Sequence, residues 1–276
     1  MTEPALRVSG LCKNFGSFAA VTDVSFEVEA GSSIGIVGES GSGKTTVARM
    51  IIGLEQPSSG TISCCGSDRS RPSRSTRARR ERARQAQMVF QDPYTSLDPQ
   101  RTVRQTLTEA VHLHKDPATS TADRVQQLAD MVALDARLLA SLPAHLSGGQ
   151  RQRVAIARAL AADPRVLVLD EAVAALDVSI QAQILNLLDD IRESTGISYV
   201  FITHDLAVVR QVTEQSIVMQ AGRIVEAGPT DDLLRHPEHP YTRALLDSVP
   251  RPGWRPRRRP TPPDNEPEAA TATPAR

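Results

Sequence analysis

Short apolar runs rich in β-forming residues alternate with polar, turn-forming residues over residues 5–37, a pattern typical of antiparallel strands. Short β-rich runs cover residues 6–8, 24–28 and 34–37, with turn-forming residues between them. We expect antiparallel strands that lead into a buried strand. Apolar residues then recur at helical spacing from Gly43 to Gly53. This part of the chain is therefore predicted to form a strand, a glycine-rich loop and a helix.

Only helical periodicity is present over residues 101–162, where Pro117 and Pro143 are breaks. We expect a helical insertion between two α/β halves. Strands and helices alternate again after it, and parallel strands joined by helical crossovers are the simplest arrangement. The predicted elements are a strand at 166–169, a helix at 178–192, a strand at 199–202, a helix at 205–212 and a hairpin through 221–223.

Two segments lack the apolar residues of a core. Residues 67–87 hold eight arginines and form either a basic patch for phosphates or RNA, or a solvated, partly helical segment. We favour the solvated segment because no aromatic residues are interleaved for base stacking. Residues 250–276 hold eight prolines and almost no apolar side chains, so we expect a disordered Pro/Arg-rich tail.

The composition restricts the class of protein. Of the 276 residues, 40% are hydrophobic and only 3% aromatic, so Ala, Val, Ile and Leu must fill the core, which favours an α/β fold. The 32 basic and 32 acidic residues cancel, and without a net field we expect no nucleic-acid partner. The longest apolar runs are strand-sized, so we expect no membrane span. The N-terminus lacks a secretory signal pattern, and we expect a cytosolic chain.

Cysteine and histidine residues give no sign of a metal centre. Cys12, Cys64 and Cys65 are odd in number and two are adjacent, which suits neither a disulfide framework nor a metal clamp, so we expect three free thiols. The prolines around His236 and His239 argue against a preset metal pair.

Residues 38–45 read GESGSGKT and fit the pattern G-x-x-x-x-G-K-[ST] without exception. They follow a predicted buried strand and precede a helix, as this motif requires. The glycines let successive backbone N–H groups turn toward one anion, and the helix N-terminus adds its positive end. We predict a nucleoside triphosphate site in which Lys44 neutralises the β- and γ-phosphates and the Thr45 hydroxyl ligates Mg²⁺. Its residues are Gly38, Glu39, Ser40, Gly41, Ser42, Gly43, Lys44, Thr45 and Thr46.

Such a site needs a further acid for magnesium at the end of a neighbouring strand. Asp170 and Glu171 follow the predicted strand at 166–169 directly. We expect Asp170 to hold Mg²⁺ and Glu171 to act as general base for the attacking water.

The sequence LSGGQRQR at 146–153 resembles the signature of ATP-binding cassette (ABC) ATPases. The resemblance extends over roughly residues 5–250. It implies that Ser147, Gly148, Gly149 and Gln150 close onto the ATP held by a partner subunit.

Other positions match family landmarks in order. Phe15 matches the aromatic residue that stacks on adenine, although a lone Phe is more often a core residue. Gln91 matches the glutamine that touches Mg²⁺ and the attacking water. Residues 174–177 match the loop that crosses the dimer, and His204 matches the switch histidine at the γ-phosphate.

Three stretches resemble the oligopeptide, dipeptide and nickel importer branch: residues 89–99, 171–183 and 239–246. Ala174 departs from the branch by the loss of one hydroxyl, which weakens the expected cross-dimer contacts slightly. Some members carry a cysteine cluster near the C-terminus. This chain has none there, so we expect no iron–sulfur centre.

The resemblance implies an α/β fold with a P-loop NTPase (RecA-like) core, an antiparallel β subdomain and an inserted helical subdomain. We expect an ABC domain over 1–250 and a tail over 251–276. Within the domain, the nucleotide-binding core covers about 1–91 and 160–235, the helical subdomain about 92–159, and a family extension 236–250.

The expected function is ATP hydrolysis that drives an ABC importer, most simply for peptides, at the cytoplasmic face of the membrane. ATP and Mg²⁺ are the expected cofactors. The partners would be membrane permease subunits, a second ATPase subunit, either identical or paralogous, and indirectly an extracytoplasmic substrate-binding protein. An ABC exporter subunit and a soluble ABC ATPase that acts on ribosomes or DNA are the alternatives.

A further expectation concerns the permease. The turn-rich surface around Asp92, Pro93, Tyr94, Leu97 and Pro99 would offer an apolar tip to a short helix of a membrane subunit. The alternative is that Tyr94 and Leu97 pack onto the helical insertion.

Overall fold

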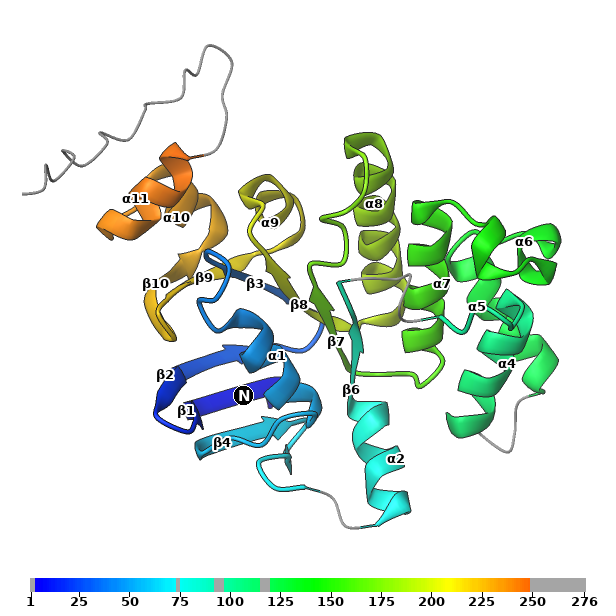
Figure 1. The fold of residues 1–276 in the computed structure, drawn as a ribbon, viewed down its shortest axis with the longest axis horizontal. Helices are drawn as coiled ribbons and strands as arrows, with labels where there is room; N and C mark the ends of the chain where they lie inside the picture. The colour runs from blue at the N-terminus through cyan, green and yellow to red at the C-terminus, as the bar shows by residue number, and fades with distance from the viewer. Residues whose placement is uncertain (1–2, 73–74, 92–96, 115–119, 249–276) are drawn as a thin grey trace, which may run out of the picture.

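The computed structural model of the chain describes residues 3–72, 75–91, 97–114 and 120–248. Within them, two sheets and a group of helices lie side by side (Figure 1). The smaller sheet has the strand order β2-β1-β4-β5 and the larger sheet the order β10-β9-β3-β8-β7-β6. The expected α/β fold with an antiparallel β part and an inserted helical part is confirmed.

The smaller sheet is antiparallel, with β1 between β2 and β4. Its buried side chains, such as Val8 and Val24, share one apolar cluster with Met50 and Ile51 of the first helix. The expected strands at 6–8 and 24–28 are present and longer than predicted. The later strands of this sheet were not predicted, because their residues are mostly small and polar. The strands are β1 (Leu6–Phe15), β2 (Phe18–Val28), β4 (Ser59–Cys64) and β5 (Ser67–Asp68).

The larger sheet has five parallel strands and one antiparallel edge strand, β10. The predicted parallel strands and the hairpin into β10 are confirmed, while β6 was not predicted. Parallel strands place their carboxyl ends along one edge, where ligands bind in such sheets. The strands are β3 (Ser33–Val37), β6 (Ala86–Val89), β7 (Val166–Asp170), β8 (Ser198–Thr203), β9 (Gln215–Gln220) and β10 (Arg223–Pro229).

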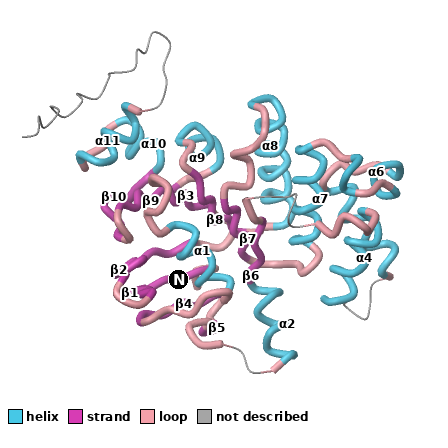
Figure 2. The backbone as a smooth tube through the Cα atoms, in the orientation of Figure 1, coloured by secondary structure: helices cyan, strands magenta, loops and turns pink. Residues whose placement is uncertain are grey.

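Helices cover both faces of this sheet, which is why its central strands are apolar throughout. Along β7, Val166 and Val168 join the cluster that contains α1, whereas Leu167 and Leu169 join the cluster that contains α8. Figure 2 shows α1 on one side of these strands and α8 on the other. The helices are α1 (Lys44–Ile52), α8 (Val178–Thr195) and α9 (Leu206–Val212).

The insertion expected at 101–162 is helical throughout its described part. Its apolar faces pack together and onto α8, and they form one core with that face of the sheet. The elements are α4 (Val103–His114), α5 (Thr121–Met131), α6 (Ala136–Ala140), the 3₁₀ turn η1 (Pro143–His145) and α7 (Gly148–Leu160).

The arginine-rich segment contains α2 (Thr76–Gln85), a helix with no buried residue, as a solvated segment predicts. Arg69 is an exception, because it is buried and its guanidinium donates to the carbonyl oxygens of Arg82 (2.9 Å) and Ile52 (3.3 Å). The prediction was wrong for Arg69 because these acceptors come together only in the folded chain.

The expected docking tip is wrong at Leu97. This side chain is 5% exposed and packs in the helical core with Val103 and Leu107. The alternative, packing onto the helical insertion, is therefore confirmed for Leu97. Pro99 is exposed. Asp92, Pro93 and Tyr94 lie outside the described residues.

The described C-terminal part ends in two short helices, α10 (Thr230–Arg235) and α11 (Pro240–Asp247). The tail predicted for 251–276 lies outside the described residues. Cys12, Cys64 and Cys65 are free, as expected. None of the helices in the described ranges combines the length and apolar character needed to span a membrane.

Candidate nucleotide-binding site

A cavity of about 700 Å³ lies at the carboxyl edge of the larger sheet. The glycine-rich loop at 38–46 forms its floor, and Gln91, Glu171 and His204 come from the ends of three neighbouring strands. Two aromatic side chains at the β1–β2 turn also line it. All the site residues predicted within one subunit line this cavity except Gly38, Ser42 and Asp170. Gly38 and Ser42 belong to the same loop, and Asp170 is bonded to Thr45 of the lining.

The loop adopts a conformation that only glycine can supply. Gly38, Gly41 and Gly43 have φ values of 152°, 81° and 101°. A Cβ atom on Gly38 would lie 2.3 Å from the carbonyl oxygen of Met219, and one on Gly43 would lie 2.6 Å from that of Ala20. The backbone is therefore packed against β9 and β2, which holds the loop open toward the cavity.

Lys44 begins α1 and its side chain is buried beneath the loop. Its Nζ donates to the carbonyl oxygens of Gly38 (2.8 Å) and Glu39 (2.7 Å). Burial lowers the pKa of Lys44, while the carboxylates of Glu171 and Asp170 act in the opposite direction. These two acceptors hold the ammonium group beneath the loop, and Lys44 also lines the cavity.

Thr45 and Asp170 form the oxygen pair expected for a magnesium ion. The Thr45 hydroxyl donates to Asp170 Oδ1 at 3.2 Å. Burial raises the pKa of Asp170, although the Thr45 hydrogen bond and the charge of Lys44 act in the opposite direction. Within the described ranges, no three His, Cys, Asp or Glu residues are grouped to hold a metal by themselves. An oxygen pair of this kind fits Mg²⁺, which binds through one or two side chains together with substrate phosphates.

Glu171 follows β7 with a strained backbone. Its φ of 48° is in the left-handed region, and its N–H donates to the carbonyl oxygen of Ile202 at 2.8 Å. This turn directs the carboxylate into the cavity between two partners. Gln91 Nε2 donates to Oε2 at 2.7 Å, and His204 Nδ1 lies 3.4 Å from Oε1. Strain that is kept at such a position is typical of a functional site.

Two exposed aromatic residues line the cavity. Phe15 is 47% exposed and Phe18 64%. Lys13 Nζ lies 4.8 Å from the centre of the Phe15 ring. The exposure argues against the core alternative for Phe15. Phe18 was missed by the sequence analysis, although its place across the turn from Phe15 could have indicated it.

The signature residues 147–150 lie away from this cavity. Ser147 caps α7 in a capping box with Gln150, whose Oε1 accepts from the Ser147 N–H at 2.9 Å. Gly149 packs on α8, where a Cβ would lie 2.5 Å from Ile180 Cγ2. None of the signature residues is among the described residues that line the cavity. One chain therefore does not bring its signature and its P-loop together.

Comparison with known proteins identifies the family of the chain. A family model described as ABC transporter matches residues 21–174. The chain belongs to the ABC transporter ATPase family. A second model, described as the C-terminal region of oligopeptide and dipeptide transporters, matches residues 225–274. This match begins within β10 and includes α10 and α11.

Individual relatives agree with the family. The oligopeptide transport ATP-binding protein OppF of Bacillus subtilis is 41% identical over 258 residues, which are 91% of this chain and 84% of OppF. The di/tripeptide transport ATP-binding protein DppF of Pseudomonas aeruginosa is 46% identical over 244 residues, 87% of this chain and 74% of DppF.

Solved structures confirm the fold of this ABC ATPase. CbiO1 of Clostridium perfringens, part of the ABC transporter complex cbiONQ, matches with a TM-score of 0.77 and 28% identity over 85% of this chain and 92% of its own. The cassette MJ0796, solved as a dimer with ADP and phosphate after hydrolysis, matches with a TM-score of 0.72 and 27% identity over 82% and 98%.

Proposed function

We propose that this ABC ATPase hydrolyses ATP to drive an importer of peptides, at the cytoplasmic face of the cell membrane. The observation that carries the proposal is the position of Glu171, held between Gln91 and His204 beside the P-loop. The peptide cargo is supported by the match at residues 225–274 and by the oligopeptide and di/tripeptide transport relatives.

The site would act through position and charge. Lys44 and the P-loop amides after Glu39 would hold the phosphates, and Phe15 and Phe18 would receive the adenine ring. Glu171 would accept a proton from the attacking water, while Gln91 orients its carboxylate and His204 approaches the γ-phosphate. These groups stabilise a transition state whose charge spreads over the phosphoryl oxygens.

Thr45, Asp170 and Gln91 would hold Mg²⁺ together with the phosphates. The ion would supply positive charge to the phosphate oxygens. It would also compensate the buried carboxylate of Asp170, whose pKa burial raises.

The complete site would need two subunits. Ser147, Gly148, Gly149 and Gln150 lie outside the cavity of their own chain, and the helix N-terminus that they form suits an anion of a partner. The crossing loop is available for this contact, since Ala174 and Asp177 are exposed and the neighbouring Val178 is 83% exposed. We propose that two such subunits enclose two ATP molecules.

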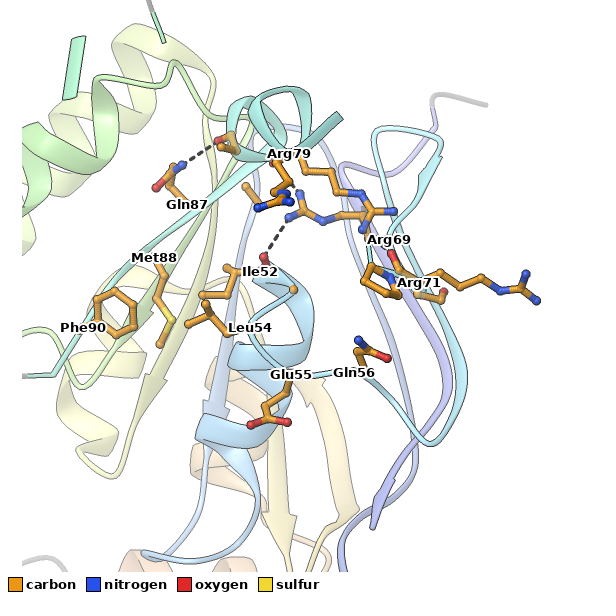
Figure 3. Close-up of a pocket in the computed structure, with 16 residues that line it drawn as sticks. Ile52, Leu54, Glu55, Gln56, Arg69, Arg71, Arg79, Gln87, Met88 and Phe90 are labelled. Atoms are coloured by element: carbon orange, nitrogen blue, oxygen red, sulfur yellow. Dashed lines mark hydrogen bonds between the residues drawn. The ribbon is translucent and has the colours of Figure 1, made fainter. Parts of the chain in front are cut away.

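A permease helix would dock where two grooves meet at Phe90. One groove, of about 420 Å³, is shown in Figure 3, with Ile52, Leu54, Met88 and Phe90 close together at one end and Arg69, Arg71 and Arg79 at the other. The second groove, of about 380 Å³, shares Met88 and Phe90 and is lined by α4. Leu54 and Phe90 are exposed apolar residues, and Phe90 precedes Gln91. A helix seated there would act on Gln91 directly.

The ATPase part is tested with the purified chain. Phosphate release from ATP should require added Mg²⁺ and stop when EDTA is added. Phosphate release that proceeds equally with EDTA would contradict the proposed site.

A further inference from the structure

Helix α11 reaches the nucleotide cavity from the far end of the chain. It lies beyond β10, at one edge of the larger sheet (orange in Figure 1). Leu245 and Ser248, at its C-terminal end, line the same cavity as the P-loop. On its first turn, the Tyr241 hydroxyl oxygen accepts a hydrogen bond from the backbone N–H of Glu39 at 3.0 Å. The C-terminal segment therefore contacts the loop at its second residue.

Both backbone polar groups of Glu39 are hydrogen-bonded. Its N–H donates to Tyr241, and its carbonyl oxygen accepts from Lys44 Nζ at 2.7 Å. The next carbonyl along the loop toward β3, that of Gly38, accepts from the same ammonium group. Tyr241 thus fixes the residue whose carbonyl oxygen positions the phosphate-binding lysine.

The Tyr241 side chain is itself well anchored. Its ring packs against a buried cluster that contains Val37, Leu206 and Leu245. The turn before α11 is tied to β10, because the Glu226 carboxylate accepts from the N–H groups of Glu238 (2.8 Å) and His239 (3.1 Å). The phenol is thus presented to the loop by rigid elements and loses little freedom when it bonds.

We infer that Tyr241 is a positioning residue of the nucleotide site, which fixes Glu39 and through it Lys44 in the arrangement that receives the triphosphate. The inference rests on the proposed function, since it concerns the same ATP site. A preorganised loop pays less ordering entropy when the ligand binds. Loss of this one neutral hydrogen bond should therefore weaken ATP binding about two- to tenfold, with little change in the rate at saturating ATP.

The test compares two variants of the full-length chain that make the same chemical change. Tyr241→Phe removes the acceptor at Glu39 and keeps the ring. Tyr199→Phe is the matched control, because the Tyr199 hydroxyl donates to the Leu188 carbonyl oxygen at 2.8 Å in the core, away from the site. The Kd of Mg·ATP is measured by calorimetry, together with Tm and the ATPase rate at saturating ATP.

Tyr241→Phe should raise Kd about two- to tenfold with kcat retained, whereas Tyr199→Phe should lower Tm and leave Kd unchanged. An unchanged Kd in Tyr241→Phe, with wild-type binding intact, overturns this inference alone. A wild-type chain that binds no ATP overturns the proposed function and the inference with it.

A second pair of variants checks that the effect passes through Glu39. Proline has no N–H, so Glu39→Pro removes the donor. In this background, Tyr241→Phe should change Kd no further. If the tyrosine substitution raises Kd equally in the wild-type chain and in the Glu39→Pro variant, the hydrogen bond is not the route, and the inference is overturned.

Discussion

Gln91 and Glu171, which lie 80 positions apart in the sequence, are joined by a hydrogen bond of 2.7 Å from Nε2 to Oε2. Gln91 directly follows Phe90, which lines both grooves at the end of β6. Gln91 therefore connects Glu171, the proposed general base, with Phe90 at the proposed permease contact. A displacement of β6 or of the residues after it would reorient the Glu171 carboxylate, which gives the grooves a physical route to catalysis.

Glu171→Gln should abolish multiple turnover and retain ATP binding, because the amide keeps the shape but does not accept a proton from water. We expect the rate to fall by at least about 100-fold. Size-exclusion chromatography with Mg·ATP should show a trapped dimer. Hydrolysis at the wild-type rate would remove Glu171 from the mechanism.

Lys44→Ala should impair nucleotide binding itself, since the phosphate oxygens would face the loop without their counter-charge. Charge-assisted hydrogen bonds are the stronger kind, and we expect the Kd of ATP to rise by at least about tenfold. Calorimetry measures the Kd, and a thermal melt checks that the variant is folded. A folded Lys44→Ala chain with wild-type affinity would refute the assignment.

A mixing experiment tests the shared site. Ser147 is exposed but caps α7, so Ser147→Arg should cost about 1 kcal/mol of stability. The variant should still fold and bind ATP, and its arginine should obstruct the partner's ATP. In a homodimer, an equal mixture with Lys44→Ala should recover about a quarter of the wild-type ATPase rate, because half of the dimers hold one intact site of two. The absence of recovery at every mixing ratio would count against independent sites formed in trans.

The groove at Phe90 predicts an uncoupled variant. Leu54 is 61% exposed and lies at the apolar end of the groove, so Leu54→Asp should cost little stability. It should reduce copurification of the permease and leave the ATPase activity of the isolated subunit unchanged. Leu97→Asp is the contrasting control, because that side chain is buried and the variant should lose thermal stability. Normal permease binding by Leu54→Asp would place the contact elsewhere.

Glu214 gives a pH-dependent stability. Its carboxylate accepts from the Ser33 N–H (2.7 Å), the Ser33 hydroxyl (2.9 Å) and Arg192. Burial opposes the shift, but these hydrogen bonds lower the pKa of Glu214 below its ordinary 4.5. A lowered pKa stabilises the native state above pH 4.5, and the contribution is lost as the pH falls through the native value.

Glu214→Gln should therefore be less stable than wild type by about 1 kcal/mol at pH 7, a small effect because the side chain is half exposed. Urea unfolding at pH 7 and at a pH below the native pKa measures it. The difference between the two proteins should vanish at the acidic pH. An equal difference at both values would show that the charge of Glu214 is not responsible.

The sequence predicted those features that depend on neighbouring residues. The P-loop and the helix that it starts are contiguous, and the apolar run of β7 is buried on both faces as its composition requires. Other features depend on distant contacts. Tyr241 meets Glu39 across 202 positions, Arg69 finds its acceptors only after folding, and Leu97 is buried by helices that follow it. Local spacing carries no signal for the contacts of Tyr241 and Arg69, and for Leu97 it left both exposure and packing open.

The most direct test is peptide uptake by proteoliposomes that contain the chain with its permease subunits. Substrate-binding protein and labelled peptide are added on one side of the membrane, and ATP is supplied on the other side, where the ATPase lies. We expect uptake that requires ATP and that stops with Glu171→Gln, although this variant still binds ATP. Uptake that persists with Glu171→Gln, or ATP hydrolysis with no peptide uptake by the wild-type complex, would contradict the proposed function.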